Sequence, residues 1–169
     1  MKSGLPLVVL GLGSNLGASQ KIILDAVKAL GTFLTDIKAA SLYLTEPLYV
    51  KGQNRFINTA AAGYFSGKPG ELLSMINKIE AQFGRDRSVE RRWGERFLDI
   101  DILLFGDLVL NDAGLQIPHP RLKERRFALE PLLELLPDAL EGGAGISYRS
   151  ICDALPDQGV ELLPVFGKK

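Results

Sequence analysis

Alternating and helical patterns of hydrophobic residues predict strands and helices in the order βαββαβ over the first 105 residues. Two amphipathic helices are predicted, one from about Ser19 to Gly31 and one from about Pro69 to Gly84. The four predicted strands cover residues 5–12, 37–45, 56–65 and 98–105. This order predicts an α+β fold with a ferredoxin-like βαββαβ core, in which an antiparallel sheet carries both helices on one face.

The chain beyond residue 106 has a less regular pattern. Residues 121–136 are helical in pattern but interrupted by Pro131, and a short helix around residues 147–154 precedes a strand at 160–163. We expect these later helices to cover the other face of the sheet, giving an αβα sandwich. No internal repeat or low-complexity segment divides the chain, so residues 1–169 are expected to form one domain.

The fourth predicted strand carries two carboxylates on one face. Asp99 and Asp101 lie about 7 Å apart at two strand rises. Aspartate is depleted in strands, and like charges on one face repel each other. A hard divalent cation such as magnesium would remove that repulsion. The opposite face of this strand is predicted to consist of Leu98, Ile100, Ile102 and Leu104.

An arginine-rich loop leads into this strand. Residues 85–96 contain five arginines and no lysine. Planar guanidinium groups suit phosphate oxygens, and magnesium commonly shares its ligand shell with substrate phosphates. The loop and the aspartate pair therefore favour a metal–polyphosphate site. A solvated loop of mixed charge is the alternative, because Asp86, Glu90 and Glu95 lie in the same stretch.

Composition and charge exclude several other classes of protein. Twenty basic and twenty acidic residues give a net charge of zero, which argues against a general binder of nucleic acid or of an anionic membrane. The third strand lacks the aromatic pattern of an RNA-recognition domain. Residues 5–12 are too short to span a bilayer, and Cys152 is alone. We therefore expect a cytoplasmic protein with no nucleic-acid or membrane partner. We separately expect the protein to be a monomer.

Glycines follow the first strand in a pattern that is close to a dinucleotide-binding fingerprint. Gly11, Gly13 and Gly17 read G-x-G-x-x-x-G, which is one residue too long for that motif. The sequence predicts instead that residues 13–17 form a turn between the first strand and the first helix.

Several segments together resemble one known family. Residues 92–103, Arg-Trp-Gly-Glu-Arg-Phe-Leu-Asp-Ile-Asp-Ile-Leu, resemble the signature of the 6-hydroxymethyl-7,8-dihydropterin pyrophosphokinases (2-amino-4-hydroxy-6-hydroxymethyldihydropteridine diphosphokinases). The other matching segments occur in the same order, at residues 13–17, 45–48 with 56–58, 118–120 and 125–127. The resemblance extends from the first strand to about Pro137.

The resemblance implies a reaction and a set of site residues. The enzyme would transfer the pyrophosphoryl group of ATP to the hydroxymethyl group of 6-hydroxymethyl-7,8-dihydropterin, giving AMP and the pterin diphosphate, in folate biosynthesis. The catalytic residues would be Arg85, Arg96, Asp99 and Asp101, with two Mg²⁺ ions on the two aspartates. ATP would contact Glu80, Arg87, Arg92, Trp93, Ile102, His119 and Arg125. The pterin would contact Thr45, Pro47, Leu48, Phe56, Asn58 and Phe127.

Other interpretations of these residues stay open. A lone histidine such as His119 is often structural, Phe56 and Phe127 are core candidates, and Glu80 could be an exposed helix acid. Departures from the family pattern occur at Arg55, Glu95 and Phe97. The alternative functions are a transferase that uses ATP and another acceptor, and a ferredoxin-like module that binds a nucleotide or RNA without turnover.

Overall fold

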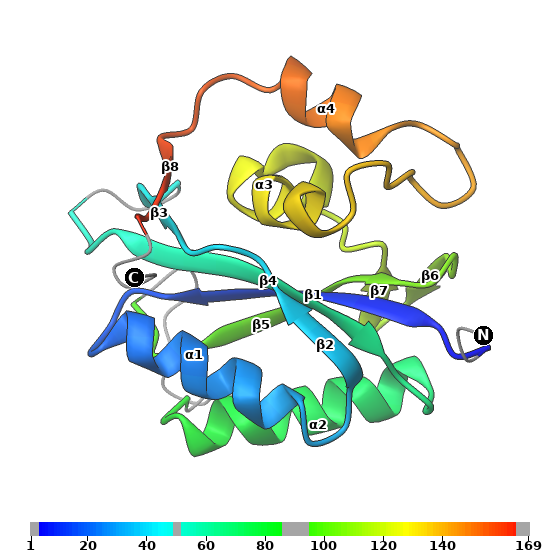
Figure 1. The fold of residues 1–169 in the computed structure, drawn as a ribbon, viewed down its shortest axis with the longest axis horizontal. Coiled ribbons are helices and arrows are strands. Elements are labelled where there is room, and N and C mark those ends of the chain that lie inside the picture. The colour runs from blue at the N-terminus through cyan, green and yellow to red at the C-terminus, as the bar shows by residue number, and fades with distance from the viewer. Residues whose placement is uncertain (1–3, 49–51, 86–94, 165–169) are drawn as a thin grey trace.

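A computed structural model describes residues 4–48, 52–85 and 95–164, which form a mixed α/β fold with an antiparallel sheet and four α-helices (Figure 1). No helix in these ranges is long and apolar enough to cross a membrane. The elements in chain order are β1 (Leu7–Ser14), α1 (Ser19–Leu30), β2 (Thr35–Ala39), β3 (Tyr43–Thr45), β4 (Phe56–Tyr64), α2 (Pro69–Gln82), β5 (Asp99–Phe105), β6 (Leu110–Asp112), β7 (Leu115–Ile117), the 3-10 turn η1 (Leu122–Glu124), α3 (Arg126–Leu135), α4 (Tyr148–Ala154) and β8 (Val160–Leu162).

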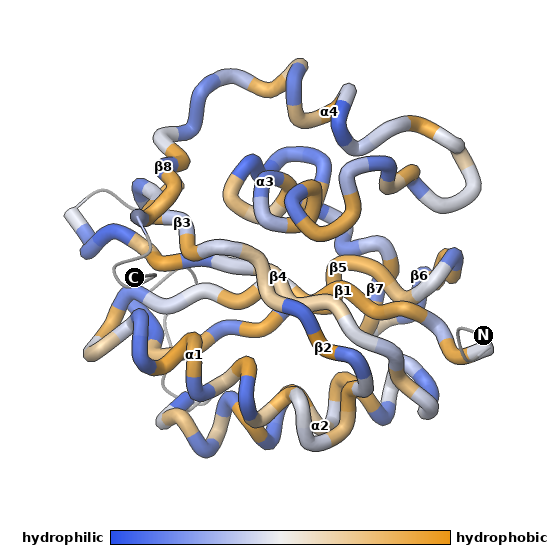
Figure 2. Tube along the Cα trace, viewed as in Figure 1, coloured by the Kyte–Doolittle hydropathy of each residue, from blue (hydrophilic) through white to orange (hydrophobic). Residues whose placement is uncertain are grey.

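The main sheet has the strand order β5-β1-β4-β3-β8, and β2 also pairs with β4. Strands β6 and β7 form a separate hairpin. Helices α1 and α2 cover one face of the sheet, and α3 and α4 lie on the other (Figure 1). Hydrophobic and hydrophilic positions alternate along α1 and α2 (Figure 2), as expected of helices with one buried side.

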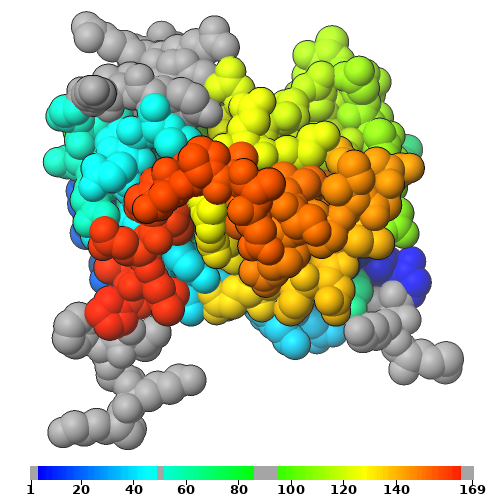
Figure 3. Space-filling view, turned by 90° about the horizontal axis from the view of Figure 1, so that it is seen from above, coloured from blue at the N-terminus to red at the C-terminus, as the bar shows by residue number. Residues whose placement is uncertain are grey.

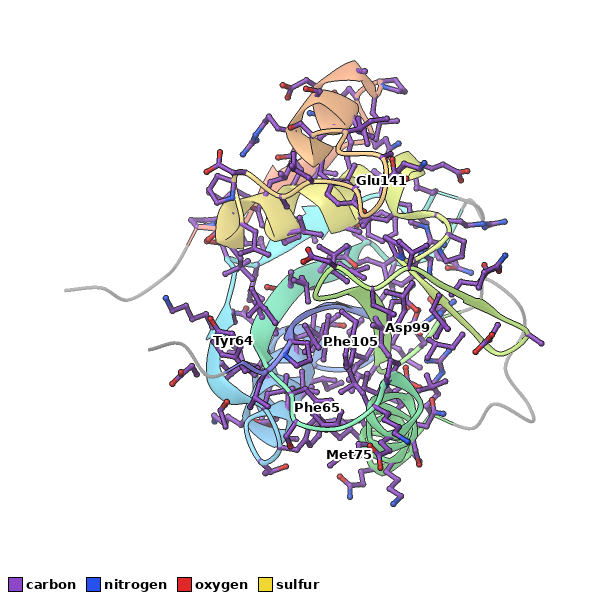
Figure 4. The ribbon with its side chains drawn as sticks, turned by 90° about the vertical axis from the view of Figure 1, so that its right-hand side faces the viewer. Tyr64, Phe65, Met75, Asp99, Phe105 and Glu141 are labelled. Atoms are coloured by element: carbon purple, nitrogen blue, oxygen red, sulfur yellow. The ribbon has the colours of Figure 1, made fainter. Side chains whose placement is uncertain are left out.

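Two hydrophobic clusters hold the layers together, one on each face of the sheet. Val8 and Leu10 of β1 pack toward α1 and α2, whereas Val9 packs toward α3 and α4. This alternation follows from the two-residue period of a strand. Phe65 and Phe105 meet edge to face in the α1–α2 layer, with ring centroids 6.3 Å apart (Figure 4).

The predicted strand at residues 37–45 is two strands, β2 and β3, which both pair with β4. The backbone leaves the ladder between them. There the Thr59 hydroxyl lies 3.0 Å from the carbonyl oxygens of Ala40 and Ser41, and the Glu134 carboxylate accepts the Ser41 N–H at 3.0 Å. Side chains therefore satisfy backbone groups that a continuous ladder would have satisfied.

The prediction that Leu104 shares a face of β5 with Ile100 and Ile102 was wrong. Ile100 and Ile102 pack toward α1 and α2 as expected, but Leu103 and Leu104 both pack toward α3 and α4. The register explains this difference, because Leu10 pairs with Ile102 while Val9 pairs with Leu104. The extra residue forms a bulge, which shifts the alternation of the residues that follow it.

The predicted helix at residues 121–136 begins later and is not interrupted. Its first part is the 3-10 turn η1, and α3 starts at Arg126 and continues through Pro131 to Leu135. Proline removes one backbone donor from a helix. Here Pro131 is buried, and its neighbours Leu129 and Leu132 belong to the hydrophobic cluster on this face of the sheet, so packing retains the helix. The short helix expected near residues 147–154 is confirmed as α4, which the Ser147 hydroxyl caps.

A buried tyrosine in α4 provides a test of stability. Tyr148 is fully buried, and its hydroxyl has no hydrogen-bond partner among the described residues. Because a buried hydroxyl without a partner is costly, Tyr148→Phe is expected to keep the free energy of unfolding or raise it by up to about 1 kcal/mol. Urea denaturation of the purified variant measures this change.

Tyr43→Phe is the matched control, because the Tyr43 hydroxyl donates to Glu134 at 2.7 Å. Loss of that hydrogen bond is expected to lower the free energy of unfolding by about 1 kcal/mol. If Tyr148→Phe lost as much stability as Tyr43→Phe, the Tyr148 hydroxyl would have a stabilising partner and the prediction would be wrong.

Candidate active site

A pocket of about 850 Å³, including its open mouth, lies between the sheet and the N-terminal end of α3. Strands β1, β4 and β5 contribute its floor, and the loop after β3 and residues 119–128 contribute its walls. It brings together side chains from segments that are far apart in the sequence. All six residues of the implied pterin site line it, namely Thr45, Pro47, Leu48, Phe56, Asn58 and Phe127.

Two glycines in the central strand open space in the floor of this pocket. Gly13 pairs with Asp99 on one side and with Asn58 on the other, and Gly11 pairs with Asp101. The prediction that residue 13 begins a turn was wrong, because β1 continues to Ser14. Side chains at positions 11 and 13 would fill the floor of the pocket between the aspartates of β5 and the polar residues of β4.

Asp99 lies at the beginning of β5 (Figure 4) and is bound by two guanidinium groups. Its two carboxylate oxygens each lie 2.5 Å from an arginine, Oδ1 from Arg85 Nη1 and Oδ2 from Arg96 Nη1. Two arginines of the arginine-rich stretch, one at each of its ends, therefore contact the aspartate strand. Arg87, Arg92 and Trp93 lie outside the described residues.

Asp101 lies two residues after Asp99 in β5 and also lines the pocket. Its side chain is 37% exposed but lies deep among protein atoms. Loss of hydration, followed by the nearby charge of Asp99, raises the pKa of Asp101 to about 7. The repulsion between Asp99 and Asp101 that the sequence predicted therefore also acts in the folded structure.

His119 is held in one orientation beside Asp101. Its Nδ1 accepts the Arg121 N–H at 3.1 Å, so the neutral ring carries its proton on Nε2, which lies 3.7 Å from Asp101 Oδ2. Burial and then the charge of Arg125 lower the pKa of His119 to about 4. The imidazole is therefore neutral at pH 7, with its N–H directed to the carboxylate side of the pocket.

Arg125 joins the two sides of the pocket. Its Nη1 lies 3.6 Å from Asp101 Oδ2, and its guanidinium carbon lies 5.5 Å from the centroid of the Phe127 ring. A guanidinium group at this distance from an aromatic ring makes a cation–π contact. The charged and the aromatic parts of the pocket are thus in direct contact through one side chain.

Glu80 and Ile102 do not line the pocket. Glu80 is 1% exposed, so it is not an exposed helix acid. Its carboxylate accepts the Ile100 N–H at 2.8 Å and binds the Arg85 guanidinium group. Ile102 packs among the apolar residues toward α1 and α2. Glu80 therefore holds two groups next to Asp99, namely the backbone of β5 at Ile100 and the Arg85 guanidinium group that binds Asp99.

Sequence reasoning missed Asn15, which connects three segments around the pocket. Its backbone N–H donates to the Arg96 carbonyl at 3.2 Å, and its Oδ1 accepts the Arg96 N–H at 2.9 Å. Its Nδ2 donates to the Asn54 carbonyl at 3.2 Å. The polar run Gly13-Ser14-Asn15 after an apolar strand was the available signal, since a buried asparagine needs several partners.

Carboxylates and guanidinium groups beside a pocket lined by Phe56 and Phe127 are typical of an enzyme that transfers phosphate-containing groups. A sequence model of the 7,8-dihydro-6-hydroxymethylpterin-pyrophosphokinase (HPPK) family matches residues 9–137. The chain belongs to this family. It is 40% identical over 161 residues to a 2-amino-4-hydroxy-6-hydroxymethyldihydropteridine pyrophosphokinase of Pseudomonas aeruginosa, covering 93% of this chain and 96% of that protein.

Longer proteins also contain a region similar to this chain. The folic acid synthesis protein fol1 of Pneumocystis carinii is 35% identical over 163 residues, which are 95% of this chain but only 22% of that protein. A crystal structure of wild-type HPPK-DHPS of Plasmodium falciparum with pteroate has a similar fold, with a TM-score of 0.70 at 15% identity over 90% of this chain and 45% of the other. The chain therefore spans less than half the length of these two proteins.

Proposed function

We propose that the protein transfers the pyrophosphoryl group of ATP to the hydroxymethyl oxygen of 6-hydroxymethyl-7,8-dihydropterin, giving AMP and the pterin diphosphate, as a step of folate biosynthesis. Membership of the family and the close likeness to the Pseudomonas aeruginosa pyrophosphokinase support this reaction. ATP is the second substrate in this proposal.

One observation carries the proposal more than any other. A single pocket has aromatic and neutral polar residues at one end and carboxylates with cationic groups at the other. Phe56 and Phe127 can contact the faces of a flat ring, and Asn58, which donates to Thr45 Oγ1 at 2.7 Å, can bond the polar edge of that ring. A bound pterin would then direct its side chain toward Asp99 and Asp101.

The aspartate pair has the chemistry of a magnesium site. Asp99 and Asp101 would be the protein ligands, because both carboxylates line the same pocket. Magnesium commonly uses one or two carboxylates and completes its shell with water and phosphate oxygens. Loss of hydration and then the charge of Asp99 raise the pKa of Asp101, and a cation would offset both costs. We propose two Mg²⁺ ions, which when bound would neutralise charge on the triphosphate.

The chain's own residues would bind and orient the two substrates. Arg85 and Arg96, which contact Asp99, would be the guanidinium groups nearest the reacting phosphates. Neutral His119 would donate from Nε2 to a phosphate oxygen, and Arg125 would add positive charge between nucleotide and pterin. Walls on both sides of the pocket would limit the access of water, which reduces wasteful hydrolysis.

Some further assignments are also proposals. The order β5-β1-β4-β3, with α1 and α2 on one face, supports a ferredoxin-like core to which β8 is added. The two hydrophobic clusters share one sheet, which supports a single domain over residues 1–169. A monomeric state and a cytoplasmic location are the simplest expectations for this enzyme.

A product assay tests the proposed reaction. The protein is mixed with ATP, magnesium and 6-hydroxymethyl-7,8-dihydropterin, and nucleotide products are separated by chromatography. Pterin-dependent AMP is the expected result. Pterin-dependent ADP would indicate ordinary phosphoryl transfer, and AMP or ADP that requires another acceptor would replace the pterin assignment. Binding of ATP without any product would favour a nucleotide-binding module.

A small substitution in the pocket floor is expected to weaken pterin binding. A Cβ atom at position 13 would lie 2.8 Å from Asn58 Oδ1, so Gly13→Ala must displace the Asn58 amide. We expect the dissociation constant of the pterin to rise about tenfold, equivalent to the loss of roughly one neutral hydrogen bond. Equilibrium binding monitored by pterin fluorescence measures it.

Gly70→Ala is the control, because a Cβ atom at position 70 meets nothing within 4 Å and the residue lies in α2. It should bind the pterin like the wild-type protein and be slightly more stable, since alanine favours helices. Unchanged pterin affinity in Gly13→Ala would remove Asn58 from the proposed contacts.

A further inference from the structure

The first turn of α3 is capped by a residue from the C-terminal part of the chain. Arg125, which precedes the helix, provides no side-chain cap. The amide of Gln158 takes this role, because its Oε1 accepts the Arg126 N–H at 2.8 Å and its Nε2 donates to the Glu124 carbonyl at 2.8 Å. The junction between η1 and α3 is thus held at both ends by one side chain located 32 residues later in the sequence.

This junction carries two residues of the candidate active site. Arg125 contacts Asp101 and the ring of Phe127, and both Arg125 and Phe127 line the pocket. Gln158 does not line the pocket itself. The hydrogen bonds of the Gln158 side chain can therefore affect substrates through residues 124–127.

The segment that contains Gln158 also reaches the opposite wall of the pocket. Residues 155–162, which we name the C-terminal strap, run from the end of α4 past α3 to β8, beside β3 (Figures 1 and 3). At the α3 side, the Arg126 guanidinium group donates to the Leu155 carbonyl at 2.9 Å. At the β3 side, Val160 pairs with Thr45.

An arginine reinforces the second attachment of the strap. Arg55 binds Glu46 Oε1 at 2.7 Å and Glu161 Oε1 at 2.9 Å. Thr45 and Glu46 line the pocket. Arg55 is a departure from the family pattern, and here it joins the pocket wall to the strap. The strap therefore touches both walls of the pocket, although it lies beyond residues 9–137 that match the family.

We propose that Gln158 is a positioning residue for the pterin and nucleotide contacts, and that the C-terminal strap holds the two walls of the pocket at the spacing that the pterin ring needs. This inference rests on the proposed function for the identity of the ligand. The amide of Gln158 holds the backbone at residues 124–126, and that backbone sets the positions of Arg125 and Phe127.

The test compares Gln158→Ala with two other variants. Gln158→Glu keeps an acceptor for the Arg126 N–H, and Gln20→Ala removes an exposed glutamine from α1, away from the pocket. For Gln158→Ala we expect the dissociation constant of the pterin, measured by fluorescence without turnover, to rise about fivefold to tenfold. Gln158→Glu should recover only part of this loss, because it keeps the acceptor for the Arg126 N–H but loses the donor to the Glu124 carbonyl. Gln20→Ala should match the wild-type protein.

Hydrogen exchange provides a readout that does not depend on activity. Amides of residues 126–129 should exchange faster in Gln158→Ala than in Gln20→Ala, while amides of β1 and β4 should be unchanged. A pterin affinity within twofold of wild type, or a loss accompanied by faster exchange throughout the sheet, would overturn the positioning role. If wild-type protein bound no pterin, the proposed function would fail, and exchange at residues 126–129 would still decide whether Gln158 holds this junction.

Discussion

Replacing Asp101 by alanine is expected to lower AMP formation by roughly a thousandfold or more, while the protein stays folded. Asp101 is one of two carboxylates proposed to hold magnesium. Within the described ranges, no third potential metal ligand lies close enough to form a cluster with them. Its pKa is raised to about 7 by loss of hydration and by the charge of Asp99. Removing a carboxylate that is repelled by its neighbour should not lower the melting temperature.

Two measurements separate this expectation from a general loss of structure. AMP formation and thermal unfolding are measured for Asp101→Ala and for Asp153→Ala, whose carboxylate lies on the exposed side of α4. Calorimetric titration with magnesium and a non-hydrolysable ATP analogue should show weakened metal-dependent binding for Asp101→Ala alone. Near-normal AMP formation by Asp101→Ala would remove Asp101 from the metal site.

Replacing Phe127 by alanine is expected to weaken pterin binding by about 2 to 3 kcal/mol, roughly 30-fold to 150-fold. The ring lines the pocket at the N-terminal end of α3, and its loss removes both buried apolar area and a stacking surface. The binding of ATP should weaken by no more than about fivefold, which corresponds to losing the cation–π contact with Arg125.

Phe127→Tyr is the matched variant, because it retains the ring. It should bind the pterin almost as well as the wild-type protein, whereas Phe127→Ala should not. Dissociation constants for the pterin and for an ATP analogue are measured separately for both variants. Equal losses for the two ligands in Phe127→Ala, together with a lower melting temperature, would indicate that Phe127 is a core residue.

Local sequence patterns were sufficient for most of the secondary structure. The apolar stripes and glycine stops predicted α1 and α2 closely, and the prediction of a mixed α/β fold with helices on both faces of an antiparallel sheet is confirmed. Besides the end of β1 and the start of α3, two misses occurred within the sheet, at Leu104 and at the break between β2 and β3. Both depend on register and on partners in other strands, which a local pattern does not contain.

The candidate site could be predicted only where residue type and spacing carried the chemistry. Asp99, Asp101 and the neighbouring arginines indicated a metal–phosphate site because paired aspartates are unusual in a strand. The family resemblance indicated the pterin residues. Asn15 and Gly13 lie in a segment that resembles the family, but nothing in the sequence indicated what they contact, and Gln158 carried no signal at all. Their roles arise from contacts with Arg96, Asn58 and Arg126, each more than 30 residues away in the sequence.

The amino-acid sequence by itself determined the family, the order of the elements and the acidic strand after an arginine-rich loop, because these follow from short-range periodicity and from motifs. Only the tertiary structure decided that Glu80 is buried and bonded to the Ile100 N–H, and that His119 is neutral. It also decided that a C-terminal residue caps α3. Burial, pKa and hydrogen-bond partners depend on which distant segments the folded sheet brings together, and no local stretch of sequence contains that information.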